Sequence, residues 1–174
     1  MDPLERLVVQ QAIVENYNCY ARGIDTKDWS LVRSCFSDSI FIDYGELDPN
    51  EEQAQVPRSA EDWLAQLQSV INGFDTTHHA ITNHQMSVAG DRISCRAYLV
   101  ADHVILPDVA MPETGPEAGA EDICTVVGEY NNDYEQQPDG RWTICYSRLY
   151  VKWSSGNTGV FVTAAERVAA ANPE

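Results

Sequence analysis

The sequence predicts an α+β domain in which three helices from the N-terminal half pack on one face of a strongly curved, mostly antiparallel sheet. The predicted shape is a cone-shaped α+β barrel. Before Gly73 apolar residues mostly recur at helical spacing. After Gly73 apolar and polar residues alternate, which is typical of strands. Two short turn-like connections, at 89–91 and 138–140, are typical of antiparallel hairpins. At 174 residues, one domain spanning 1–174 is expected.

The three helices follow from their start and stop signals. Asp2 caps a first helix with a proline in its first turn, which is expected to run to Gly23. A short second helix is expected over 27–36. Ser59 opens a capping-box pattern, so a third, amphipathic helix should start there and end near Gly73.

The strands follow from alternation of apolar and polar residues. They are expected over 39–44, 78–88, 92–106, 123–136 and 141–153. The segment 107–121 holds three prolines and two glycines among several acids, which predicts a flexible loop or lid. A short tail is expected after residue 154, with Thr163 as a candidate cap of a final short helix. A curved sheet closed by helices leaves a conical cavity, which is a natural small-molecule site.

The composition restricts the partners. The net charge is −16, with 27 acidic against 11 basic residues, so nucleic acid and anionic membrane surfaces are unfavourable partners. The N-terminus has no basic or apolar leader, and no apolar run approaches the roughly 20 residues of a membrane helix. A cytoplasmic protein is therefore expected. Five widely spaced cysteines without a C-x-x-C pattern indicate reduced, buried thiols.

Strand alternation turns several polar side chains inward. His103 shares a face with Leu99 and Ala101, although such a lone inward histidine is more often a core residue than a catalyst. Tyr44 lies on the inner face of the strand 39–44. Arg148 shares a face with core-like residues of its strand, so it either pairs with an acid or reaches a pocket.

Three histidines lie close together in the sequence, at His78, His79 and His84. Residues five apart on a regular strand face opposite ways and no acid has a suitable spacing, so a transition-metal site is not expected. The alternation does not decide which of His78 and His79 faces inward, because Ile81 shares the face of His79 while Met86 and Val88 share that of His78.

Several segments together resemble a SnoaL-like domain of the NTF2-like superfamily. They are 20–29 (YARGIDTKDW), 35–38 (CFSD), 79–83 (HAITN), 128–134 (GEYNNDY) and 139–142 (DGRW). The resemblance runs from about Leu4 to Trp153. It implies the cone fold, frequent homodimers or homotrimers, and acid–base chemistry on a small-molecule substrate without a cofactor or metal. Dehydratases, a dehydrochlorinase, isomerases and polyketide cyclases belong to this superfamily.

The resemblance also implies site residues. Asp25 matches an aspartate at the end of the first helix, and His79 matches the histidine that pairs with it in the dehydratases. Tyr44 and His103 match a tyrosine and a second histidine of that group, although an aspartate near this last position in another dehydratase leaves open whether Asp102 or His103 faces the site. Tyr20 and Arg148 resemble positions in a bile-acid dehydratase of the superfamily, and Asn83 and Tyr130 lie within matched segments; these four are the expected substrate-binding residues. The lysine that the dehydrochlorinase carries where Tyr20 stands is missing, which disfavours dehalogenation.

These residues predict an acid–base enzyme without a cofactor, most readily a dehydratase, with isomerisation and ring closure as alternatives. In this hypothesis Asp25 orients His79, and His79 removes a proton next to a carbonyl group. Tyr44 or Arg148 holds the developing enolate, and His103 protonates a leaving hydroxyl. The substrate class would be a small cyclic, polyketide-like or aromatic hydroxy-carbonyl compound. The other hypothesis is a non-catalytic binding protein, or a subunit similar to the β-subunits of ring-hydroxylating dioxygenases.

Overall fold

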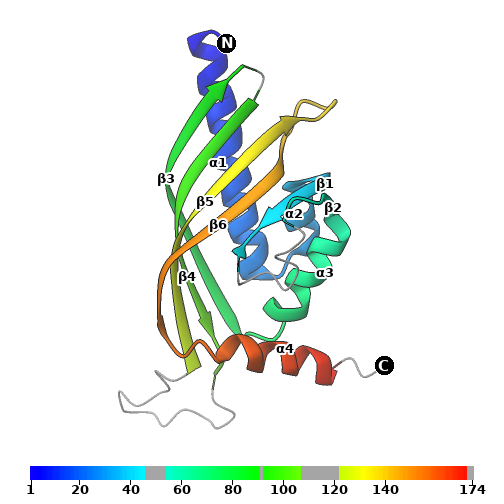
Figure 1. The fold of residues 1–174 in the computed structure, drawn as a ribbon, viewed down its shortest axis with the longest axis vertical. Coiled ribbons are helices and arrows are strands. Elements are labelled where there is room, and N and C mark those ends of the chain that lie inside the picture. The colour runs from blue at the N-terminus through cyan, green and yellow to red at the C-terminus, as the bar shows by residue number, and fades with distance from the viewer. Residues whose placement is uncertain (46–53, 91, 107–121, 172–174) are drawn as a thin grey trace.

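The computed structural model describes residues 1–45, 54–90, 92–106 and 122–171. In this part of the chain four helices accompany one mixed six-stranded sheet, with strand order β2-β1-β6-β5-β4-β3. The sheet is curved and does not close on itself, and the long helix α1 lies along one side of it (Figure 1). The α+β prediction is confirmed.

The helices begin at the residues that their capping signals indicate. Helix α1 (Pro3–Thr26) starts with a complete capping box between Asp2 and Glu5, and it runs one turn beyond the predicted end. Helix α2 (Trp29–Ser34) is shorter than predicted, because the Asp28 side chain caps it at Leu31 N. Helix α3 (Ala60–Ile71) is capped by Ser59, as predicted.

Four long strands form most of the sheet. They are β3 (Thr76–Ala89), β4 (Arg92–Val104), β5 (Ile123–Gln136) and β6 (Trp142–Gly156), and each pairs antiparallel with the next of the four. Strand β1 (Phe36–Asp43) starts earlier than predicted and runs parallel to β6, and β2 (Arg58–Ser59) is a two-residue addition on its edge. A two-residue strand is too short for alternation to reveal, which explains why the sequence did not indicate it.

The tail after residue 154 is more ordered than predicted. Strand β6 continues to Gly156, and helix α4 (Val160–Ala171) begins three residues before Thr163. Figure 1 shows α4 crossing the base of the sheet, near the end of α3. Arg167 fastens it there by an ion pair to Asp75, 2.9 Å from Nη1 to Oδ2. The predicted flexible loop at 107–121 lies outside the described residues.

The core lies between α1 and the concave face of the sheet. Alternate residues of β4 are buried from Ile93 to His103, and alternate residues of β5 from Cys124 to Tyr134. From α1, Ile13, Tyr17 and other residues of the same helix face pack against this surface. The interior is therefore apolar with a high share of tyrosine.

Two bulges change which side chains face this interior. In β3 the register skips between Thr82 and Gln85, where Asn83 has a positive φ of 57°. In β6 the pairing moves from Ile144 directly to Tyr146, so Cys145 is the extra residue. An extra residue reverses the inside–outside alternation beyond it, because side chains on a strand alternate with a period of two.

Candidate active site

The Asp25 and His79 side chains contact one another in the interior of the fold, as the resemblance implies. Asp25 lies near the C-terminal end of α1, and His79 lies near the start of β3. The Asp25 Oδ1 atom is 2.7 Å from His79 Nδ1, and Oδ2 accepts a hydrogen bond of 2.9 Å from the backbone N–H of the same histidine. The Thr77 hydroxyl donates a third bond to Oδ1, also at 2.9 Å. The carboxylate is therefore held at both oxygen atoms.

The environment of Asp25 keeps its carboxyl group ionised. Burial alone would raise its pKa, but the hydrogen bonds from the ring and backbone of His79, together with that from Thr77, lower the pKa below its usual value. The position gains nothing from the helix, since the C-terminal end of α1 carries partial negative charge. The three donors thus offset these two unfavourable effects and keep the carboxylate ionised.

The hydrogen bond to Asp25 also fixes the tautomer of His79. An ionised carboxylate only accepts, so Nδ1 carries the proton and Nε2 presents its lone pair. The His79 side chain is only 6% exposed. Within the described part of the chain, Nε2 has no hydrogen-bond partner, and such an atom can accept a proton from a bound molecule.

His103 lies beside this pair, on the inner face of β4. Its ring centroid is 5.5 Å from that of His79, in an edge-to-face arrangement, and the rings of Phe74 and Phe161 pack around it at 5.1 and 4.6 Å. Burial, reinforced by His79, lowers the pKa of His103 to about 4. Asp102 lies on the opposite face, where it accepts a hydrogen bond from Thr125 at 2.6 Å. The inward residue is thus His103, and it is neutral near pH 7.

Three tyrosines form the polar wall of the interior. Tyr20, Tyr44 and Tyr130 are buried, and the Tyr130 ring is 6.0 and 6.2 Å from the other two. Burial, followed by the neighbouring tyrosines, raises the pKa of Tyr20 and of Tyr130 well above the usual value. The ionised Asp25 also contributes to the shift at Tyr130, so this wall lies close to the dyad. These phenols are neutral hydrogen-bond donors.

The hydroxyl of Tyr44 contacts a buried polar pair on the neighbouring strands. Tyr44 Oη is 3.3 Å from Ser147 Oγ, and that serine donates a stronger bond of 2.8 Å to Asn132 Oδ1. Since Ser147 has already used its proton, Tyr44 is the donor in the longer bond. Ser147 and Asn132 are both buried, so they form a support behind the tyrosine wall.

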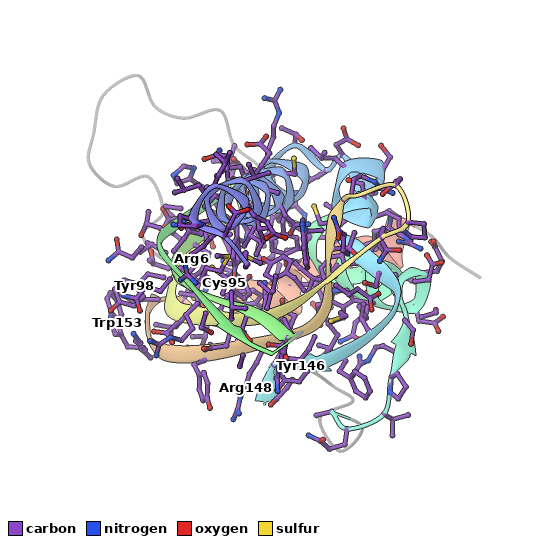
Figure 2. The ribbon with its side chains drawn as sticks, turned by 90° about the horizontal axis from the view of Figure 1, so that it is seen from above. Arg6, Cys95, Tyr98, Tyr146, Arg148 and Trp153 are labelled. Atoms are coloured by element: carbon purple, nitrogen blue, oxygen red, sulfur yellow. The ribbon has the colours of Figure 1, made fainter. Side chains whose placement is uncertain are left out.

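Arg148 does not join these residues, and its predicted position on the inner face is wrong. The bulge at Cys145 turns Ser147 inward and Arg148 outward. Its Nε is 3.1 Å from Asp43 Oδ2, and its guanidinium lies 4.2 Å from the ring centre of Tyr150. Figure 2 shows Arg148 on the side of the sheet away from α1. Arg148 thus pairs with an acid, and it also lines a cavity, but that cavity lies on the outer face of the sheet and not inside the cone.

Asn83 does not face the interior of the cone, where it was predicted to bind a substrate. It is exposed at the β3 bulge, in a left-handed conformation that asparagine tolerates better than most residues. The bulge resolves the ambiguity of the histidines, because His79 and Ile81 face inward before it and Met86 after it. His78 is exposed.

Sequence reasoning missed three polar residues of this region. Thr77 lies two residues before His79, so strand alternation would have placed it on the same face. Ser147 could not be found in this way, because only the bulge turns it inward. Trp63 was not singled out, because on the amphipathic helix α3 its ring counts as an apolar residue; the ring packs on Tyr44 of the tyrosine wall, and its indole nitrogen is buried without a partner among the described residues.

The described cavities lie elsewhere. One, of about 390 Å³, is lined by Arg92, Arg96, Arg148 and their neighbours, and a second adjoins it near Phe41; neither is lined by Asp25 or His79. No three His, Cys, Asp or Glu side chains gather as metal ligands in the ranges that the structure describes. Likewise, none of the helices described has the length and apolar character to cross a membrane.

Comparisons with known proteins agree with this fold. The sequence profile of the SnoaL-like domain matches residues 5–148. The structure of the Kfla4162 protein from Kribbella flavida is 27% identical, with a TM-score of 0.65 over 91% of this chain and 95% of that one. No curated protein is significantly similar in sequence.

Two further solved structures share the fold at lower identity. The hexachlorocyclohexane dehydrochlorinase LinA-type3 from Novosphingobium barchaimii is 15% identical, with a TM-score of 0.67 over 91% of this chain and 96% of that one. ActVI-ORFA from Streptomyces coelicolor is 17% identical, with a TM-score of 0.57 over 83% and 97%.

Proposed function

Since the chain belongs to the SnoaL-like family, we propose that it is an acid–base enzyme without a cofactor, and that it removes water from a small cyclic β-hydroxy ketone. The observation that carries this proposal is the Asp25 carboxylate, which accepts three hydrogen bonds and holds His79 with Nε2 unpartnered in a buried site. A protein that only binds a ligand has no need of a fixed, ionised aspartate behind a histidine.

The proposed reaction starts at His79. Its Nε2 takes the proton from the carbon next to the carbonyl group, and the electron pair of that C–H bond moves toward the carbonyl oxygen. Asp25 stabilises the resulting imidazolium, as carboxylates do in other histidine-dependent enzymes. A base of this kind typically contributes 10²–10⁴-fold to the rate. The phenol of Tyr44 donates a hydrogen bond to the developing enolate oxygen.

The second step breaks the carbon–oxygen bond of the β-hydroxyl. The imidazolium of His79 returns its proton to the leaving oxygen, so one molecule of water is lost and the histidine is regenerated. His103 is a poor proton donor, because its pKa of about 4 leaves it neutral near pH 7. We therefore replace its expected role as an acid by that of a neutral hydrogen-bonding partner for the hydroxyl group. Isomerisation would use the same base with a different site of reprotonation.

We also propose that the enzyme is a homo-oligomer formed through the outer face of its sheet. Four exposed apolar side chains lie there in adjacent cross-strand rows, Tyr98 with Tyr150 and Val100 with Trp153. Contiguous exposed apolar surface of this kind usually marks an interface. A second copy is the proposed partner, because most soluble oligomers are built from identical subunits. The stripe adds little repulsion to such a contact, since Lys152 beside it is balanced by Glu129 at 3.4 Å.

The direct test is turnover of 3-hydroxy-1-tetralone, whose loss of water gives 1-naphthol. This product is aromatic and fluorescent, so its formation is favourable and easily followed. We expect His79→Ala to reduce kcat by at least about 100-fold, and Asp25→Asn to be nearly as damaging, because an amide cannot stabilise the imidazolium. The double variant should lose little more than the worse single variant, since residues that act as a unit are not additive.

The matched control is His78→Ala, which removes an exposed histidine next to the proposed base. It should keep the wild-type rate, and thermal unfolding curves should show that all four variants are folded. If His79→Ala keeps wild-type turnover, or if its loss only follows unfolding, the dyad is structural. In that case the non-catalytic binding protein is the better interpretation of the fold.

A further inference from the structure

Trp63 buries a hydrogen-bond donor without satisfying it. The residue lies in the first turns of α3 and is only 2% exposed, and its Nε1 atom has no hydrogen-bond partner in the part of the chain that is described. Leaving a buried donor unpaired is destabilising, because the donor loses its hydrogen bond to water and gains none in return. Phenylalanine or leucine would fill an apolar position without this cost. The indole is thus retained at an energetic disadvantage in the free protein.

Trp29 gives an internal comparison. Its Nε1 donates to Asn72 Oδ1 at 3.1 Å, so the fold can supply a partner for an indole N–H where one is needed. No such partner is given to Trp63, although its ring packs edge-to-face on Tyr44 at 5.0 Å. Tyr44 in turn contacts Tyr130, which is close enough to Asp25 to be affected by its charge. The unpaired donor therefore lies at the end of the tyrosine wall of the proposed site.

The charge of the interior limits what can bind there. All 11 lysines and arginines of the sequence lie within the described residues, and none of them is buried. The ionisable pair in this region is Asp25 with His79, and Asp25 is anionic. The guanidinium of Arg58 lies 5.8 Å from the ring centre of Trp63, but it is only half-buried and already donates to Gln66 at 3.1 Å. A carboxylate or phosphate on a ligand would therefore lose its hydration without gaining a fully buried cation, and it would be repelled by Asp25. The site therefore suits an uncharged ligand.

We propose that Trp63 is a specificity-determining residue, whose indole N–H donates a hydrogen bond to an oxygen of an uncharged cyclic ketone at the Tyr44 end of the site. This inference rests on the proposed function, and it adds the charge and the orientation of the substrate. The oxygen held by Trp63 and Tyr44 is the carbonyl oxygen, so the hydroxyl group to be lost points toward His103.

The experiment uses 1-tetralone as the probe, because this ketone has no hydroxyl group to lose and stays intact. The full ¹⁵N-labelled chain has four tryptophans, and single Trp→Phe variants assign their indole signals. On titration we expect the Trp63 indole proton to move downfield, as a proton does when it enters a hydrogen bond. The Trp29 signal, already bonded to Asn72, should stay nearly in place.

Affinity gives a second readout. Trp63→Phe should raise the Kd of 1-tetralone by roughly threefold to tenfold, the value of one neutral hydrogen bond, whereas Trp29→Phe should leave it unchanged. The 6-carboxylate of 1-tetralone should bind at least about tenfold more weakly than 1-tetralone itself. Both affinities can be measured by equilibrium dialysis, independently of turnover.

Any of four results would overturn the inference. They are no binding of 1-tetralone, an unmoved Trp63 signal at saturating 1-tetralone, equal affinities of the Trp63→Phe and Trp29→Phe variants, and binding of the 6-carboxylate as tight as that of 1-tetralone. The wild-type titration decides the matter even if Trp63→Phe fails to fold. The outcome is separate from that of the proposed function. A Trp63 shift without turnover of 3-hydroxy-1-tetralone would contradict only the reaction, and turnover without the shift would contradict only the role of Trp63.

Discussion

Replacing His103 by phenylalanine should make the stability of the protein less sensitive to acid. The histidine ring is packed among Phe74, Phe161 and His79, and it is only 6% exposed. Burial and the neighbouring His79 lower its pKa from 6.5 to about 4, against smaller opposing effects of a hydrogen bond to the Cys124 backbone and of the charges of Asp102 and Asp25. In the unfolded chain the same histidine titrates near 6.5. Phenylalanine fills a similar volume and removes this difference.

The magnitude comes from the two pKa values. Between pH 6.5 and about 4 the unfolded state binds a proton at His103 that the folded state does not bind. Stability from this group is therefore fully present above 6.5 and is lost as the pH falls toward 4. At pH 5 the gap of about 1.5 units, at roughly 1.4 kcal/mol per unit, amounts to about 2 kcal/mol. The variant should not show this part of the loss.

The assay is urea unfolding followed by circular dichroism at pH 7, 6 and 5, all above the isoelectric point of about 4.4. The drop in the free energy of unfolding from pH 7 to 5 should be about 2 kcal/mol smaller in His103→Phe than in the wild type. The control variant is His78→Gln, which removes an exposed histidine. It shows how much the loss of a histidine that is not buried changes the drop in the free energy of unfolding. Equal drops in wild type and His103→Phe would refute the reasoning that burial keeps His103 neutral.

Three other outcomes are expected. Thr77→Val should raise the pKa of Asp25, read from its ¹³Cγ shift, whereas Thr77→Ser should retain the low value because it keeps the hydroxyl; equal titrations in both variants would exclude a role for this bond. Trp153→Glu should shift the sedimentation of the oligomer toward monomer, and a wild-type chain that is already monomeric would contradict the interface. Gly73→Ala should destabilise the fold by about 1–3 kcal/mol in urea unfolding, since the added Cβ would lie 1.9 Å from the carbonyl oxygen of Ala164 in α4. An unchanged midpoint would show that α4 can shift away from residue 73 without a loss of stability.

The sequence by itself determined the order of the elements and the faces of the regular strands. Capping signals at Asp2 and Ser59 located two helix starts, because a helix must satisfy its first N–H groups and only a few side chains can do so. Along β4 the alternation is unbroken, so counting residues was enough to turn His103 inward. The family resemblance pointed to Asp25 and His79, whose catalytic roles remain proposals.

Only the tertiary structure decided how side chains are oriented beyond an interruption of the strand pattern. The extra residues at Asn83 and Cys145 reverse the alternation, which moved Arg148 to the outer face and brought Ser147 to the inner one. A bulge depends on pairing with the neighbouring strand, and this pairing cannot be predicted from the local order of apolar and polar residues. The neutrality of His103 and the unpaired donor of Trp63 are also tertiary, because desolvation and missing partners exist only once distant segments enclose the side chain.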